Sequence, residues 1–271
     1  MQERPHNIAL YPTVCLLRGD RIVRRRLGSK MREIARPSMT CARVMGGVAG
    51  STLVVIFLFF PRHAASLFAR LSPQVTFFVP TTLPAVALTI DDGPDSQGTP
   101  DILDALREHQ ARATFFVIGE HVAGNEPLLS RIQAEGHELA NHTFRERMSL
   151  LVPSSELSQE LSSTHNLLSP FGDVRWFRPG SGLYSSSMIE MATQHGYRLV
   201  LGDVFPLDGR LPSSSFHSWY ILRHARPGSI IILHDAKGRG ARTARTLRRV
   251  LPVLRERGFQ AVTVSGLAAL Q

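Results

Sequence analysis

The chain has 271 residues, of which 43% are hydrophobic and 20% charged, and its formal net charge is +9. This length and composition suit one globular domain of roughly 200 residues with an appendage. Both cysteines, Cys15 and Cys41, lie near the N-terminus. A disulfide framework or a cysteine metal site is therefore excluded for the rest of the chain.

The positive charge is concentrated at the N-terminal end. Residues 1–45 hold ten basic and three acidic side chains, whereas the rest of the chain holds 21 basic and 19 acidic ones. Nucleic-acid binding needs a basic surface on the folded part, and this balance gives none, so we expect no nucleic-acid partner. The arginine-rich segment 239–249 alternates with apolar residues at helical spacing and is interpreted as a solvated helix face.

Four regions follow one another along the sequence. Residues 1–43 form a basic segment, and residues 44–60 are apolar and uncharged. A run of about 17 residues is at the lower limit for a membrane-spanning helix. The basic residues before it predict a single-pass anchor with a cytoplasmic N-terminus and an extracytoplasmic domain; a buried core helix is the alternative. Residues 61–80 are predicted to be a linker and residues 81–271 the main domain.

Short apolar runs alternate with amphipathic stretches from about residue 75 onwards. Strands are predicted at 86–90, 113–118, 138–141, 176–178, 198–201, 229–233 and 260–264. Helices are predicted at 101–110, 127–135, 154–168 and 243–257. This alternation is typical of parallel strands joined by crossover helices, which makes the fold class α/β. Reactive side chains in such folds gather at the C-terminal ends of the strands.

Two polar clusters at predicted strand ends could bind a metal ion. Asp91 and Asp92 follow a strand directly, and two adjacent carboxylates can divide the work of metal ligand and base. An aspartate pair beside Gly-Pro is also common in turns. His142 and Glu146 are four residues apart and converge on one ion if the segment is helical; the alternative is a surface pair.

Two further clusters offer an arginine and a histidine. Arg178 precedes a Pro-Gly loop, where its guanidinium can hold a carboxylate through two hydrogen bonds. His234 stands at the end of the apolar strand at 229–233, where a buried histidine with satisfied hydrogen bonds is the simpler interpretation. Each cluster alone is a weak indication of function.

The order of these clusters resembles the polysaccharide deacetylase (NodB-homology) family, which is similar to carbohydrate esterase family 4. The resemblance covers about residues 85–266 and rests on five motifs in sequence. The family pattern T-F-D-D-G-P corresponds to residues 89–94 here, H-[S/T]-x-x-x to 142–146, R-P-P-x-G to 178–182, the aspartate of the fourth motif to Asp208, and L-H-D to 233–235.

The resemblance implies a distorted (β/α) barrel and a hydrolase that removes N-acetyl groups from a chitin-like or peptidoglycan-like glycan. Asp91 would be the general base that takes a proton from the attacking water, positioned by Arg178. His234 would be the general acid for the leaving amine, oriented by Asp208. The backbone N–H of Ser181 would stabilise the oxyanion.

The resemblance also implies a divalent cofactor, zinc with cobalt or manganese as alternatives, held by Asp92, His142 and Glu146. Glu146 stands where the family has a second histidine. A carboxylate can still bind zinc, but it makes the site more anionic and favours oxygen-binding metals. Gly180 replaces a proline and Gly202 a tryptophan of the family pattern, which changes the groove wall.

The substitution at Glu146 leaves a second hypothesis open. The chain could be a catalytically weak or inactive relative that serves as a membrane-anchored glycan-binding protein. The presence of Asp91, Arg178, Asp208 and His234 argues against it, because a binding protein needs neither a base, an acid, nor their partners.

Overall fold

The computed structural model describes residues 61–271. The predicted basic segment 1–43 and the predicted anchor 44–60 lie outside the described residues. Within residues 61–271, every helix is too short or too polar to cross a membrane.

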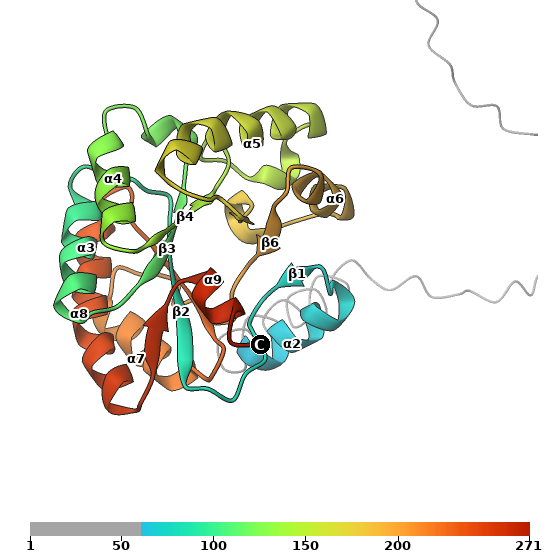
Figure 1. The fold of residues 1–271 in the computed structure, drawn as a ribbon. Helices are drawn as coiled ribbons and strands as arrows, with labels where there is room; N and C mark the ends of the chain where they lie inside the picture. Colours follow the sequence, from blue (N-terminus) through green and yellow to red (C-terminus); the bar gives the residue numbers. More distant parts are fainter. Residues whose placement is uncertain (1–60) are drawn as a thin grey trace, which may run out of the picture. The chain divides into compact units, whose positions relative to one another are not determined.

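The described chain is built on a parallel sheet of eight strands (Figure 1). The strands are β1 (Val75–Thr76), β2 (Ala85–Asp91), β3 (Ala113–Val117), β4 (Glu138–Asn141), β5 (Trp176–Phe177), β6 (Arg198–Val200), β7 (Ile230–His234) and β8 (Gln260–Val262). Their order in the sheet is β1-β6-β5-β4-β3-β2-β7. The remaining strand, β8, pairs with β2 and lies outside this linear order. The predicted α/β class with parallel strands is confirmed.

Helices surround the sheet, and α3 and α8 pack side by side on its outer face (Figure 1). The helices are α2 (Pro61–Leu71), α3 (Gly98–Glu108), α4 (Glu126–Ala134), α5 (Ser154–Leu168), α6 (Ser186–Gln194), α7 (Ser214–His224), α8 (Gly240–Glu256) and α9 (Val264–Ala268). Short 3-10 turns are η1 (Gly119–His121), η2 (Ser149–Leu151), η3 (Ser169–Phe171) and η4 (Gly180–Gly182).

The sheet curls so that its two ends approach each other. Val204, just after β6, forms a single parallel bridge with Ile231 in β7, and Phe78 forms an antiparallel bridge with Ser229. These isolated bridges stand where a closed barrel would have a full ladder. The structure is therefore a curled, incompletely closed parallel barrel.

Alternation along the strands divides the core in two. Successive side chains of a strand point to opposite faces. On β2, Val86, Leu88 and Ile90 belong to the larger hydrophobic cluster that also contains helix residues such as Leu103. The smaller cluster contains Ala87 from the opposite face of β2, together with residues of the neighbouring strands and of α9. The curled sheet thus has a packed interior, and the same alternation carries polar residues inward at its C-terminal edge.

Residues 61–80, predicted as a linker, are part of the fold. They contain α2 and β1, and β1 pairs with β6. Val75 and Phe77 are buried in the main core. Arg62 also pairs with the buried Asp203 at 2.7 Å. The linker prediction is wrong because these contacts are made with residues far along the chain and leave no local pattern.

The sequence patterns do not predict α6 and α7, which begin at serine caps. The Ser185 side chain accepts a hydrogen bond from Met188 N, and the Ser213 side chain accepts one from Phe216 N. Such capping satisfies a backbone donor that the first turn of a helix leaves free. Both helices carry polar residues through much of their length, so the apolar periodicity that reveals a helix is weak.

Candidate active site

The predicted site residues converge at the C-terminal ends of the strands. Asp91 on β2 and His234 on β7 are register partners in neighbouring parallel strands. Neighbouring strands are about 4.8 Å apart, so the predicted base and the predicted acid flank the same small volume. His142 and Arg178 come directly after β4 and β5, on the same edge.

Arg178 is buried and fixes Asp91. Its Nη1 donates to Asp91 Oδ1 at 2.6 Å and to Thr89 Oγ1 at 2.7 Å. Its other nitrogens donate to the carbonyl oxygens of Val200 and Leu201. A guanidinium held at four points places the Asp91 carboxylate in one orientation.

Asp208 and His234 form a second charged pair. His234 Nδ1 lies 2.9 Å from Asp208 Oδ1, and His234 N donates to Asp208 Oδ2 at 2.8 Å. Burial alone would lower the pKa of His234, but the hydrogen bond and charge of Asp208, with the charges of Asp91 and Asp92, raise the pKa to about 9. The imidazole is therefore protonated at neutral pH, as a general acid must be.

Asp92 and His142 have the geometry of two metal ligands. His142 Nδ1 lies 2.7 Å from the carbonyl oxygen of Arg178, which directs Nε2 toward Asp92 Oδ1 at 3.3 Å. Two ligands bound tetrahedrally at about 2.0–2.1 Å lie roughly 3.3 Å apart, so this spacing fits zinc. Burial would raise the pKa of Asp92, but the hydrogen bond and charge of His142 and the charges of His234 and Arg239 hold the pKa well below its usual range.

Glu146 does not join these two residues. Its Oε2 lies 2.7 Å from Lys237 Nζ, and its Oε1 lies 4.0 Å from Arg239 Nη2. The same Arg239 nitrogen is 2.7 Å from Asp92 Oδ2. In the described part of the chain, no three His, Cys, Asp or Glu side chains are grouped closely enough to hold a metal. Glu146 as a ligand therefore stays a prediction.

Local packing explains two departures from the family pattern, Gly180 and Gly202. Ser181 lies in η4 with a positive φ of 69°. A Cβ at Gly180 would overlap the carbonyl oxygen of Arg147, so the backbone of the preceding loop fills the space of a proline ring. A Cβ at Gly202 would lie 2.7 Å from Ile230 O, which leaves no room for a tryptophan there. The oxyanion role of Ser181 stays a prediction.

Sequence reasoning missed Arg239. It was included in a solvated helix face, but its side chain is only 14% exposed and contacts Asp92. The available signal was its position five residues after His234, in the loop that leaves a strand with site residues. Asp235 of the L-H-D motif is buried and accepts a hydrogen bond from the Thr99 hydroxyl.

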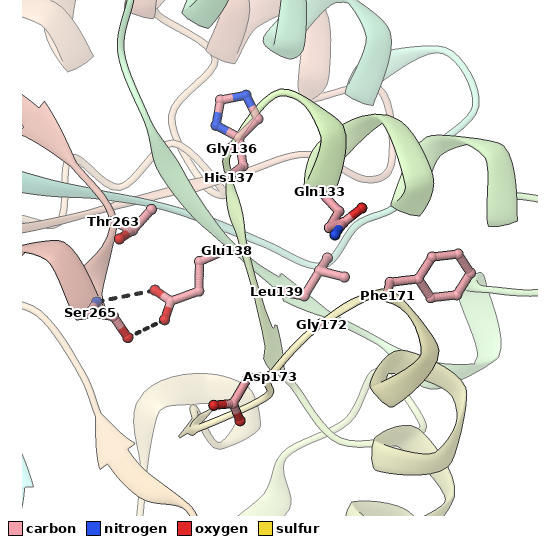
Figure 2. Close-up of a pocket in the computed structure, with 10 residues that line it drawn as sticks. All are labelled: Gln133, Gly136, His137, Glu138, Leu139, Phe171, Gly172, Asp173, Thr263 and Ser265. Carbon is pink, nitrogen blue, oxygen red and sulfur yellow. Dashed lines mark hydrogen bonds between the residues drawn. The ribbon is translucent and has the colours of Figure 1, made fainter.

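A separate hollow of about 280 Å³ lies at the start of β4, at the opposite end of the strand from His142 (Figure 2). Glu138 lines it, but its carboxylate already accepts hydrogen bonds from Thr114 Oγ1 at 2.6 Å and from the backbone and hydroxyl of Ser265. The Glu138 carboxylate is therefore already occupied by hydrogen bonds within the fold.

The fold and the site together define a hydrolase of the α/β class. The carboxylate of Asp91 and the imidazolium of His234 lie side by side at the C-terminal edge of its sheet. Comparison with known proteins gives the family. The sequence profile of the family described as "Polysaccharide deacetylase" matches residues 78–200. A peptidoglycan-N-acetylglucosamine deacetylase of Bacillus cereus is 33% identical over 196 residues, covering 71% of this chain and 92% of that protein. A chitooligosaccharide deacetylase of a Bradyrhizobium species is 34% identical over 190 residues, covering 65% of this chain and 87% of that protein.

Solved structures agree. The crystal structure of a peptidoglycan N-acetylglucosamine deacetylase in complex with 4-naphthalen-1-yl-N-oxidanyl-benzamide superposes with a TM-score of 0.71 at 28% identity. The match covers 75% of this chain and 97% of that one. The chain belongs to the polysaccharide deacetylase family, whose members are hydrolases that are generally metal-dependent.

Proposed function

We propose that this chain hydrolyses the N-acetyl amide of a chitin-like or peptidoglycan-like glycan. The observation that carries the proposal is the register pairing of Asp91 with His234. It places a carboxylate held by Arg178 beside an imidazole held by Asp208, as amide hydrolysis requires. The activities for which the two relatives are named, on peptidoglycan N-acetylglucosamine and on chitooligosaccharides, suggest the substrate class.

The protein's own residues account for the proton transfers. Asp91 accepts a proton as water attacks the acetyl carbonyl, and Arg178 keeps the Asp91 carboxylate oriented for this step. His234 then gives its proton to the leaving amine nitrogen, while Asp208 holds Nδ1 and keeps the other nitrogen directed at the substrate. The backbone N–H of Ser181 would donate to the developing oxyanion.

A divalent metal, for which we propose zinc, would be held by Asp92 and His142. Bound there, it would polarise the acetyl carbonyl and increase the acidity of the attacking water. One imidazole and one carboxylate suit zinc, and cobalt or manganese would be accepted by the same donors.

We also propose that residues 44–60 anchor the protein in a membrane with the catalytic domain on the extracytoplasmic side. This location would place the domain next to cell-envelope glycans. The support is the uncharged run of residues 44–60 and the basic segment before it.

Acetate release by the full chain tests the activity. Chitooligosaccharides and peptidoglycan fragments serve as substrates in the presence of zinc. Asp91→Asn and His234→Gln should each lower the rate by about 10²–10⁴-fold, the range that general acid–base catalysis contributes. Asp173→Asn is the matched control, because that acid is exposed and pairs with Arg175 away from the site.

One result would favour the alternative function. Binding of these glycans without any acetate release, together with unchanged behaviour of both variants, would indicate a membrane-anchored glycan-binding protein. The observation in favour of this alternative is that Glu146 pairs with Lys237 instead of joining Asp92 and His142.

A further inference from the structure

The carboxylate of Glu146 is bound by two cations from another loop. Lys237 Nζ lies 2.7 Å from Oε2, and Arg239 Nη2 lies 4.0 Å from Oε1. The same Arg239 nitrogen is 2.7 Å from Asp92. Arg239 thus stands between the carboxylates of Asp92 and Glu146, which occupy two metal-ligand positions of the family pattern, and both oxygens of Glu146 face a cation.

The two sides of this contact come from separate parts of the fold. Glu146 follows β4, and its main-chain N–H donates to Glu120 Oε1 at 3.0 Å, so its backbone is fixed. The side chain is 27% exposed. Lys237 has a positive φ of 59°, which is uncommon for a residue other than glycine. Such a backbone conformation costs free energy and is often found where it positions a functional side chain.

We propose that Lys237 and Arg239 form a cationic clasp that competes with a divalent metal for Glu146. With the clasp closed, only Asp92 and His142 offer donors to the ion. With the clasp open, Glu146 is released and completes a three-residue site. This inference rests on the metal site of the proposed function, and it makes Glu146 a conditional ligand whose availability the two cations control.

The energetics make Lys237 the residue to test. In the observed orientation both oxygens of Glu146 face cations, so in this proposal the carboxylate turns away from Lys237 when it binds the metal, and metal binding must overcome the free energy of this ion pair. Lys237 is 67% exposed, which places the pair among surface salt bridges. Arg239 also holds Asp92, so its replacement would disturb a metal ligand directly. Lys237 makes no such contact among the residues that the structure describes.

Calorimetric titration of the full chain with zinc measures the competition. Lys237→Met should bind zinc about two- to fivefold more tightly than the wild type, the range expected for losing a surface ion pair. In a Glu146→Gln background, the same substitution should leave the affinity unchanged. Arg245→Met is the matched control: it removes an exposed positive charge from α8, and its zinc affinity should equal that of the wild type.

A structure of the zinc-loaded protein gives a second readout. An oxygen of Glu146 should lie about 2.0–2.2 Å from zinc, with Lys237 displaced from the carboxylate. Equal zinc affinities for Lys237→Met and wild type would overturn the clasp, as would a zinc-loaded structure in which Glu146 still pairs with Lys237.

Acetate release from the same preparations separates this inference from the proposed function. Acetate release combined with no effect of Lys237→Met overturns the clasp and leaves the deacetylase standing. Tighter zinc binding by Lys237→Met without acetate from any variant supports the clasp and overturns the deacetylase. Failure of every variant to bind zinc overturns both.

Discussion

Replacing Arg62 with alanine tests whether α2 is an integral part of the domain. Arg62 Nη1 donates to Asp203 Oδ2 at 2.7 Å, and the Asp203 side chain is fully buried. Asp203 also accepts hydrogen bonds from Ser229 Oγ at 3.0 Å and from Ile230 N at 2.8 Å, at the start of the strand that carries His234. The pair therefore connects the first described helix to a central strand of the site.

The expected loss of stability in Arg62→Ala follows from the burial of Asp203. Removing one partner of a buried ion pair costs about 3–5 kcal/mol, because the remaining charge is left without compensation. The two other donors to Asp203 remain in Arg62→Ala, so we expect the lower end, about 3 kcal/mol. For a domain of this size, 1 kcal/mol corresponds to about 2–4 °C, so the midpoint of thermal unfolding should fall by roughly 6–12 °C.

The pH dependence gives a second check. Burial raises the pKa of Asp203 above its ordinary value, although Arg62 and the two hydrogen bonds oppose the shift. Losing Arg62 raises this pKa further, so the folded variant takes up a proton more readily than the unfolded chain. A neutral carboxyl needs no counter-charge. The loss of unfolding free energy in the variant, relative to the wild type, should therefore be largest at neutral pH and shrink as the pH falls.

Urea unfolding of the full chain, followed by circular dichroism, measures the effect. Arg70→Ala on the same helix is the control, because Arg70 is exposed and its loss should change stability by less than about 0.5 kcal/mol. A second variant, Arg62→Ala with Asp203→Asn, should recover part of the loss. A cost below about 1 kcal/mol for Arg62→Ala would refute the reasoning, because the Arg62–Asp203 pair would then behave like an exposed surface ion pair.

Three other substitutions test the site. Asp208→Asn should lower the pKa of His234 in the metal-free protein from about 9 toward 6.5, as measured by NMR titration. In the wild type, the stabilisation of the fold by this pair is complete below pH 6.5 and is lost as the pH rises through 9. An unchanged titration would show that Asp208 does not hold the proton. Arg178→Lys should slow acetate release by about 10–100-fold, since lysine lacks the planar fork, and a rate equal to wild type would contradict the positioning role. Gly180→Ala should cost about 1–3 kcal/mol in urea unfolding because its Cβ meets the Arg147 carbonyl oxygen, and an unchanged midpoint would mean that this loop yields freely.

The sequence by itself determined the strands that carry the site and the order of their polar ends. The strand predicted at 86–90 is β2, and the helix predicted at 154–168 has the bounds of α5. Both are recognisable because a buried strand and an amphipathic helix leave their own periods in consecutive residues. The pairing of Asp91 with Arg178 and of Asp208 with His234 was implied by the family resemblance and is present in the structure.

Only the tertiary structure decided which charges meet. Arg62 and Asp203 are 141 positions apart, and Arg239 and Asp92 are 147 apart, so no local pattern records either contact. Glu146 shows the same limit: its spacing from His142 suggested a shared ion, but its partner is Lys237 on a loop that the parallel sheet brings alongside. Periodicity reports which face of an element is buried, whereas the identity of an ionic partner depends on how distant loops are brought together by the fold.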